Sequence, residues 1–120
     1  MGSATKIWTY EMGVYPKGCK MIIYVDIDET IANTPDSRDY NESTPIVENI
    51  EKVNRYYDNG HTVVYWTARG SGTGLDWYDV TKKQLISWGA KHHDLKLGKP
   101  VYDLFIDDKA INSYTWEKTI

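Results

Sequence analysis

The sequence contains only one cysteine and one phenylalanine in 120 residues, and it has no long apolar run. The single cysteine, Cys19, excludes an internal disulfide and a metal site built from paired cysteines, which fits a reducing compartment. No stretch approaches the roughly 20 apolar residues of a membrane-spanning helix. Residues 1–20 also lack the apolar core of a signal peptide. We therefore expect a cytoplasmic protein without a membrane partner.

The sequence also has fewer basic than acidic residues. Fourteen Lys and Arg residues stand against seventeen Asp and Glu residues, which gives a formal net charge of -3. Without a net basic field, nucleic acid is not an expected partner. The content of 41% hydrophobic and 26% charged residues is typical of one folded domain at this length. The ten Tyr and five Trp residues are abundant by comparison, and they favour half-buried positions around clefts and subunit contacts.

The regular pattern of the chain starts at Met21, so we predict one domain over residues 21–120. Residues 1–20 are interpreted as an N-terminal extension, either partly a cloning remnant or a small hairpin. After Met21, four apolar runs have the length and composition of strands. They are residues 21–25, 62–66, 94–97 and 102–106.

Two segments between these runs have the apolar spacing of helices. The first begins with Thr44 as its N-cap and Pro45 as its first helical residue, follows the loop 31–43, and ends at Asn59-Gly60. The second runs from about Asp76 to Trp88, with Tyr78, Leu85 and Trp88 on one face. The resulting order β-α-β-α-β-β predicts an α/β fold with a mostly parallel sheet flanked by helices, because parallel strands need crossover connections.

Polar side chains follow three of the predicted strands. Asp26 and Asp28 follow the first, Thr67 follows the second, and Asp107 and Asp108 follow the last. Because the carboxyl ends of parallel strands meet at one edge of a sheet, we expect these side chains to converge. Four carboxylates repel one another unless a cation lies among them, and oxygen ligands favour a hard ion such as Mg²⁺. The sequence therefore predicts a magnesium site.

The Asp26-Ile27-Asp28 triplet has other interpretations. An EF-hand loop starting at Asp26 needs glycine at its sixth place and glutamate at its twelfth, but Ile31 and Ser37 occupy those places. A sugar-nucleotide transferase that uses such a triplet normally needs a much longer chain. The triplet taken alone is also compatible with two solvated carboxylates at the end of a strand.

Four short motifs, in order, resemble those of the haloacid dehalogenase superfamily of phosphohydrolases. Residues 26–30, DIDET, match its DxDxT signature, and Thr67 after TVVYW looks like its second motif. Lys99 in GKP resembles the third motif, and IDD at residues 106–108 resembles the fourth. The resemblance spans residues 21 to about 112. The wider patterns YWTARGSGTG and LGKPVYDLFIDDKAIN are similar to small phosphatase-like proteins of polysaccharide and capsule gene clusters.

This resemblance implies a compact Rossmann-like core and a role for each motif residue. Asp26 would be the nucleophile that forms an aspartyl phosphate, and Asp28 the general acid and base. Thr67 and Lys99 would bind the phosphoryl group. Mg²⁺ would be held by Asp26, by the backbone carbonyl of Asp28, and by Asp107, with Asp108 binding directly or through water. The two connections where the family inserts a cap, residues 31–66 and 68–98, are filled by predicted elements, so we expect no cap domain.

Several assignments have an alternative. Lys96 competes with Lys99 for the third motif, although Lys99-Pro100 matches the family phrase better. Arg69, in the glycine-rich segment 68–74, is a candidate for substrate contact because arginine forks suit phosphate, and an exposed arginine on a flexible turn is the alternative.

Outside the four motifs, His92, His93 and Asp94 indicate a polar connection more than a second metal site. Arg38 and Tyr40 in the first loop are candidates for a lid over the open site. A neighbouring subunit of a homo-oligomer is another way to supply that lid.

The predicted function is a Mg²⁺-dependent phosphomonoesterase that acts on a small phosphorylated metabolite, with sugar phosphates as one candidate class. The open site leaves an alternative, a phosphatase of a macromolecular phosphate such as a nucleic-acid end or a phosphoprotein. The acidic charge balance argues against the nucleic acid. A non-catalytic protein that binds a phosphorylated ligand is the third possibility.

Overall fold

The computed structural model describes residues 20–116. Within this range the chain divides after Asp103 into two units: Lys20–Asp103 forms one, and residues 104–116 belong to the other. The extension predicted for residues 1–20 lies outside the described residues, apart from Lys20. The boundary predicted at Met21 therefore stays a prediction.

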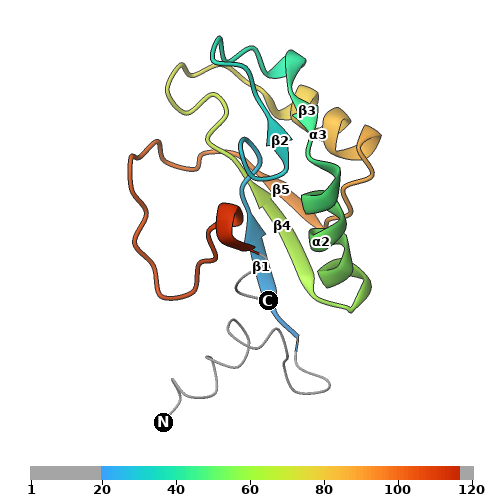
Figure 1. Ribbon diagram of the computed structural model, residues 1–120. Coiled ribbons are helices and arrows are strands. Elements are labelled where there is room, and N and C mark those ends of the chain that lie inside the picture. Colours follow the sequence, from blue (N-terminus) through green and yellow to red (C-terminus); the bar gives the residue numbers. More distant parts are fainter. Residues whose placement is uncertain (1–19, 117–120) are drawn as a thin grey trace. The chain divides into compact units, whose positions relative to one another are not determined.

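The Lys20–Asp103 unit is built on a parallel three-stranded sheet (Figure 1). Its strands are β1 (Ile22–Val25), β4 (Thr62–Trp66) and β5 (Asp94–Lys96), in the order β1-β4-β5. Val25 is in register with Tyr65, and Tyr65 with Leu95, so that these three buried side chains lie on one face of the sheet. The α/β class and three of the four predicted strands are confirmed.

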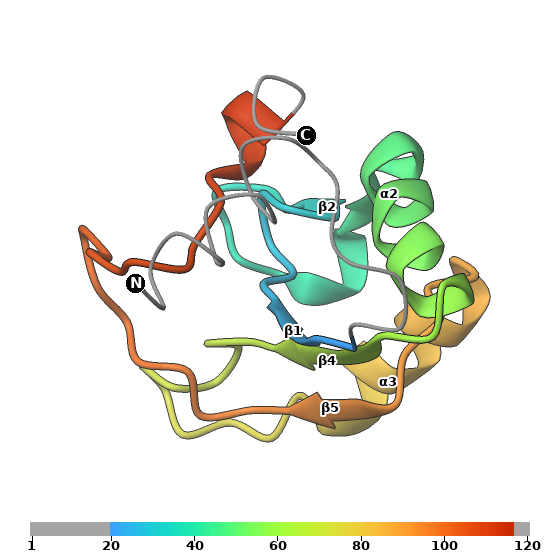
Figure 2. The ribbon, with the colours of Figure 1, turned by 90° about the horizontal axis from the view of Figure 1, so that it is seen from below.

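Two helices form the crossovers between these strands. Helix α2 (Val47–Asp58) connects β1 to β4, and α3 (Tyr78–Ser87) connects β4 to β5. Both crossovers lead in the same direction along the sheet, from β1 to β4 to β5. Right-handed connections therefore place both helices on the same side of the sheet (Figures 1 and 2). Ile50 and Val53 of α2 and Leu85 of α3 are buried, because each helix turns its apolar stripe toward the core.

The first helix starts later than predicted. Thr44–Pro45 forms a short strand, β3, which pairs antiparallel with β2 (Ala32–Asn33). The backbone N–H of Ile46 then donates to the carbonyl of Ile31 at 2.8 Å. Because this pairing keeps residues 44–46 extended, the N-cap is Ile46 and the prediction of Thr44 as N-cap and Pro45 as first helical residue is wrong. Tertiary pairing has overridden a local capping signal here.

The ends of both helices are as predicted. Helix α2 stops before Gly60, whose φ of +91° is a left-handed conformation that favours glycine. Helix α3 stops before Gly89, with φ of +70°. Its buried face differs from the prediction, because Tyr78 is exposed and Thr81 is fully buried beside Leu85.

The strand predicted at residues 102–106 is wrong, since this segment has no regular structure. The exposed fractions are 75% for Leu104, 47% for Phe105 and 88% for Ile106. An apolar run becomes a strand only where a neighbouring strand takes its backbone hydrogen bonds, and none pairs with it among the described residues. The regular element described in the second unit is a 3-10 turn, η2 (Ser113–Thr115), capped by the side chain of Asn112.

The connections of the Lys20–Asp103 unit contain no inserted domain. Between β1 and β4 lie β2, a 3-10 turn η1 (Tyr40–Glu42), β3 and α2, and between β4 and β5 lie a loop and α3. We call residues 32–45, which contain β2, η1 and β3, the flap. Neither α2 nor α3 is long and apolar enough to traverse a bilayer, and no other described helix is.

Candidate functional site

Three of the predicted site residues come together beyond the carboxyl ends of the sheet. Asp26 directly follows β1, Thr67 directly follows β4, and Lys99 lies shortly after β5. The backbone N–H of Thr67 donates to the carbonyl of Lys96 at 3.0 Å, and that of Lys99 donates to the carbonyl of Thr67 at 3.1 Å. These bonds extend the β4–β5 ladder past its last residues, so the edge of the sheet itself positions the site.

Asp26 and Lys99 form a loose ion pair. The Nζ of Lys99 lies 3.5 Å from Oδ1 of Asp26, and 37% of the Asp26 side chain is exposed. Burial raises the pKa of Asp26 above its usual value, as does the charge of Asp28 to a smaller degree. The ammonium of Lys99 and the backbone N–H of Ile27 oppose this rise in pKa. The site therefore holds a carboxylate whose charge is only partly compensated.

The surroundings distinguish Lys99 from Lys96. Nζ of Lys99 lies 5.8 Å from the ring centre of Trp66 and 5.3 Å from that of Tyr102, so the buried ammonium has aromatic neighbours. Lys96 is exposed, and its Nζ donates to the hydroxyl of Tyr24 at 3.3 Å. Of the two lysines, the structure brings Lys99 to Asp26.

A tight turn follows Asp26 and sends Asp28 to different partners. The carbonyl of Ile27 accepts hydrogen bonds from the N–H groups of Thr30, Ile31 and Ala32 at 3.1, 2.8 and 3.1 Å. Ile27 and Ile31 are fully buried, which anchors the turn in the core. The chain is therefore extended only as far as Asp26, and the two carboxylates do not share one partner: Asp26 pairs with Lys99, and Asp28 pairs with Arg69.

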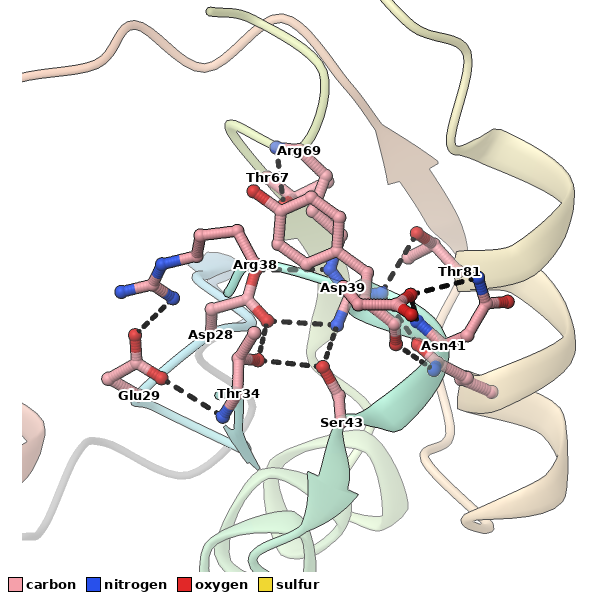
Figure 3. Close-up of polar contacts among 12 residues, drawn as sticks. Asp28, Glu29, Thr34, Arg38, Asp39, Asn41, Ser43, Thr67, Arg69 and Thr81 are labelled. Carbon is pink, nitrogen blue, oxygen red and sulfur yellow. Dashed lines mark hydrogen bonds and ion pairs between the residues drawn. The ribbon is translucent and has the colours of Figure 1, made fainter. Parts of the chain in front are cut away.

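Arg69 is the centre of a buried polar group that we call the Arg69 cluster (Figure 3). The cluster joins Arg69 to Asp28 of the turn after β1, to two residues of the flap and to two residues of α3. Its members are Arg69, Asp28, Tyr40, Ser43, Thr81 and Gln84. No part of the Arg69 side chain is exposed, against 15% of Asp28.

The guanidinium of Arg69 grips Asp28 with two parallel bonds. Nε donates to Oδ2 of Asp28 at 3.0 Å, and Nη2 donates to Oδ1 at 2.9 Å. Nη1 donates to Oγ1 of Thr81 at 3.1 Å and to Oε1 of Gln84 at 2.6 Å. Nη2 also donates to Oγ of Ser43 at 3.3 Å. All five N–H groups of the guanidinium are therefore used within the chain.

The flap is held to this cluster by its own polar residues. The hydroxyl of Thr34 donates to Oδ1 of Asp28 and lies 2.7 Å from the hydroxyl of Ser43 (Figure 3). The ring of Tyr40 covers the guanidinium of Arg69, 4.7 Å from its carbon. The backbone carbonyl of Tyr40 accepts from Nε2 of Gln84 at 2.6 Å.

These contacts bear on two earlier predictions. The sequence makes Arg69 a candidate for substrate contact, and this contact stays a prediction. In the structure all guanidinium donors of Arg69 already have acceptors within the chain. Arg38 and Tyr40 were candidates for a lid. Tyr40 is part of the Arg69 cluster, whereas Arg38 is at the surface, where it donates to Glu29 at 2.7 Å (Figure 3).

Asp107 and Asp108 lie in an exposed coil of the other unit. The carboxylate of Asp107 accepts from the backbone N–H of Asp108 at 2.7 Å. Their predicted approach to Asp26 stays a prediction. Within residues 20–116, no group of three or more His, Cys, Asp or Glu side chains is arranged to hold a metal ion. The magnesium site therefore belongs to the proposal below.

The two adjacent histidines have structural partners. His92 lies 2.8 Å from both the amine of Lys82 and the carbonyl of Ala90, and burial lowers its pKa. Nδ1 of His93 accepts from the backbone N–H of Val63 at 3.1 Å, and its ring stacks on Tyr57. These contacts are those of a polar connection between α3 and β5.

The glycine-rich loop is shaped by Gly70, whose φ is +83°. A Cβ at this position would lie 2.1 Å from the backbone oxygen of Leu75, so only glycine fits. The hydroxyl of Ser71 donates to the carbonyl of Lys99 at 2.8 Å. The loop thus joins the segments that carry Arg69 and Lys99.

Four polar residues of this site were not singled out from the sequence. They are Thr34, Ser43, Thr81 and Gln84. One available signal was Thr81, which lies four residues before Leu85 and so on the buried face of α3. Thr34 and Ser43 lie in a polar loop and have no comparable signal.

Comparison with known proteins bears on the fold. No family model matches the sequence. No curated protein matches it either. The structure is similar to a crystal structure of a structural-genomics target from Vibrio cholerae, with a TM-score of 0.71 and 23% sequence identity, over 85% of this chain and 90% of that chain. At this identity the likeness concerns the fold alone.

Proposed function

We propose that this chain is a Mg²⁺-dependent phosphomonoesterase with a Rossmann-like core of the haloacid dehalogenase type. The observation that carries the proposal is the meeting of Asp26, Thr67 and Lys99 beyond the carboxyl ends of β1, β4 and β5. In open α/β sheets this edge is where ligands bind. A half-exposed carboxylate next to a buried ammonium offers a nucleophile and a neutralising charge for a phosphoryl group.

In the proposed reaction, each group has the role that the resemblance to the haloacid dehalogenase superfamily implies. A carboxylate oxygen of Asp26 attacks phosphorus, and the bond to the leaving oxygen breaks. Asp28 gives that oxygen a proton and later removes one from the water that hydrolyses the aspartyl phosphate. Lys99 balances the phosphoryl charge, and the hydroxyl of Thr67, which accepts from the backbone N–H of Arg69 at 3.1 Å, can donate to a phosphoryl oxygen. Phosphoryl transfer needs mainly positioning and charge neutralisation, which these side chains supply.

The oxygen donors of the chain suit Mg²⁺. This ion keeps several waters and takes one or two carboxylates together with substrate phosphate. Asp26 offers one partly exposed carboxylate, whereas the carboxylate of Asp28 is held by Arg69 and can contribute only its backbone carbonyl. Asp107, with Asp108, would supply the remaining protein oxygens. Mg²⁺ at this place would neutralise charge on the transferred phosphoryl group.

The proposed substrate class is a small phosphorylated metabolite, with sugar phosphates as one candidate. The support for this class is the resemblance of residues 65–74 and 97–112 to small phosphatase-like proteins of polysaccharide and capsule gene clusters. The net charge of -3 disfavours a nucleic-acid end. A phosphoprotein and a non-catalytic phospho-ligand protein are outcomes of the tests.

The experiment compares the wild-type chain with Asp26→Asn in a phosphate-release assay on p-nitrophenyl phosphate, with Mg²⁺ and with EDTA. We expect Mg²⁺-dependent release by the wild type and a loss of about a thousandfold or more in Asp26→Asn, since the amide cannot form the phosphoenzyme. Asp79→Asn, an exposed acid at the start of α3, is the matched control and should keep its activity.

Each result has a distinct meaning. Undiminished activity in Asp26→Asn would refute Asp26 as the nucleophile. A wild-type chain that binds inorganic phosphate but releases none from any phosphomonoester would leave the binding protein as the function. If the wild type is active, a panel of phosphorylated sugars and phosphopeptides identifies the substrate class.

A further inference from the structure

Arg69 has no place in the reaction described above, yet it is the most completely bonded side chain near the site. Its guanidinium is fully buried and all five N–H groups have acceptors. Burying an arginine is costly unless it is paired and hydrogen-bonded. Such an arrangement is unnecessary for holding a loop, because apolar side chains of similar volume stabilise a core as well or better. A requirement of the site is therefore the better explanation.

The two bonds to Asp28 define what Arg69 controls. A bidentate fork holds both oxygens of a carboxylate in one plane and leaves little rotational freedom. The hydroxyl of Thr34 reaches Oδ1 as well, so Oδ1 has two donors and Oδ2 has one. Oδ2 is then the oxygen with capacity left to exchange a proton with a reacting group.

The other side of the guanidinium fixes Arg69 itself. Thr81 and Gln84 both project from α3, which the core holds through Leu85. Ser43 and the ring of Tyr40 add contacts from the flap. The orientation of Asp28 is thus fixed, through Arg69, by a helix that packs on the sheet, in addition to the buried turn that follows Asp26.

We propose that Arg69 is a positioning residue that aims Oδ2 of Asp28 at the leaving-group oxygen, and that it does not itself bind substrate. This inference rests on the proposed function. It assigns Arg69, with Thr81 and Gln84 behind it, to the proton-transfer step alone. Aspartyl-phosphate formation from an ester whose leaving group needs no proton should then be nearly independent of Arg69.

The test uses two probes that differ in this need. Phenyl phosphate leaves as a basic phenoxide and requires a proton, whereas 2,4-dinitrophenyl phosphate leaves as a stable anion. The parameter kcat/KM is measured, since it covers the steps up to the phosphoenzyme. For Arg69→Lys, which keeps the charge and loses the fork, we expect a fall of about a hundredfold with phenyl phosphate and less than about threefold with 2,4-dinitrophenyl phosphate.

Controls separate this role from stability and from substrate binding. Arg55→Lys, an exposed position on α2, should behave as the wild type on both probes. Asp28→Asn should reproduce the selectivity of Arg69→Lys, and the double variant should lose little more than Asp28→Asn, because both changes remove one function.

A second variant covers the case in which Arg69→Lys does not fold. Gln84→Ala removes one acceptor of Arg69 at a partly exposed position, where water can replace it, so this variant should fold. We expect its kcat/KM to fall about fivefold with phenyl phosphate and to stay unchanged with 2,4-dinitrophenyl phosphate.

The results that overturn the inference are specific. Equal losses on the two probes, in folded Arg69→Lys or Gln84→Ala, assign Arg69 a purely structural role. A rise in KM for both probes with unchanged kcat makes it a substrate ligand instead. A wild-type chain inactive on both probes refutes the proposed function itself, which is a different failure.

Discussion

The two carboxylates that follow β1 are close in sequence, and the structure treats them in opposite ways. Asp28 is 15% exposed and is held by a fully buried arginine with two short bonds. Asp26 is 37% exposed, and the Nζ of Lys99 lies 3.5 Å from its carboxylate. The fold fixes the orientation of the Asp28 carboxylate. The carboxylate of Asp26 keeps accessible oxygens and has a raised pKa. The accessibility of Asp26 suits the nucleophile that we propose, and the fixed orientation of Asp28 suits the proposed acid.

The largest expected difference is between the free energies of unfolding of the variants Arg69→Ala and Lys99→Ala. Arg69→Ala should lower the free energy of unfolding by about 3–5 kcal/mol, because it leaves the buried carboxylate of Asp28 without its partner. Lys99→Ala should lower it by less, about 1–2 kcal/mol, because water reaches Asp26 but the contacts of the buried ammonium with Trp66 and Tyr102 are lost. Urea unfolding followed by circular dichroism measures both. Equal losses would remove the contrast drawn above.

The ring of Tyr40 provides a smaller test of the same cluster. Tyr40→Leu keeps an apolar side chain but removes the ring that lies over Arg69 and meets Trp77 edge-on. We expect a loss of about 1–2 kcal/mol from the cation–π contact and the aromatic pair. Tyr114→Leu, an exposed tyrosine of the second unit, is the control. An unaltered unfolding midpoint in Tyr40→Leu would show that the flap is not fastened at this point.

The pH dependence of stability tests Asp26 in metal-free buffer. Because burial raises its pKa, the folded chain binds this proton more tightly than the unfolded chain, and stability falls as pH rises through the folded pKa. Asp26→Asn should therefore unfold at a higher temperature than the wild type at neutral pH. The difference in unfolding temperature should vanish below about pH 3.8, the ordinary pKa of an aspartate. A variant that is less stable at neutral pH would contradict this environment.

The smallest effect is expected at the surface of the flap. Arg38 and Glu29 form an ion pair whose side chains are 50% and 38% exposed. Arg38→Ala should change the free energy of unfolding by about 0.5 kcal/mol or less, and the change should disappear in high salt. Comparison of urea midpoints at low and high salt measures it. If Arg38→Ala lost as much free energy of unfolding as Arg69→Ala, the exposure of the two arginines would not explain their contributions to stability.

Predictions from the sequence were most accurate where a local signal and the tertiary structure agree. The runs at residues 21–25 and 62–66 became β1 and β4, and Gly60 and Gly89 end the helices at positive φ. They were wrong where packing decides. Thr44-Pro45 has a good capping pattern, but pairing with β2 keeps it extended, and the apolar residues 102–106 have no strand to pair with among the described residues.

The sequence by itself determined which chemical groups the site can use: two acids after one strand, a threonine after the next, and a lysine after the third. Only the tertiary structure decided which acid meets which cation. Asp28 and Arg69 are 41 residues apart in the chain, and their pairing depends on the turn at Ile27 and on the position of α3. Periodicity reports local geometry, whereas pairing between distant residues depends on how the elements pack, and that packing gave Asp26 and Asp28 different environments.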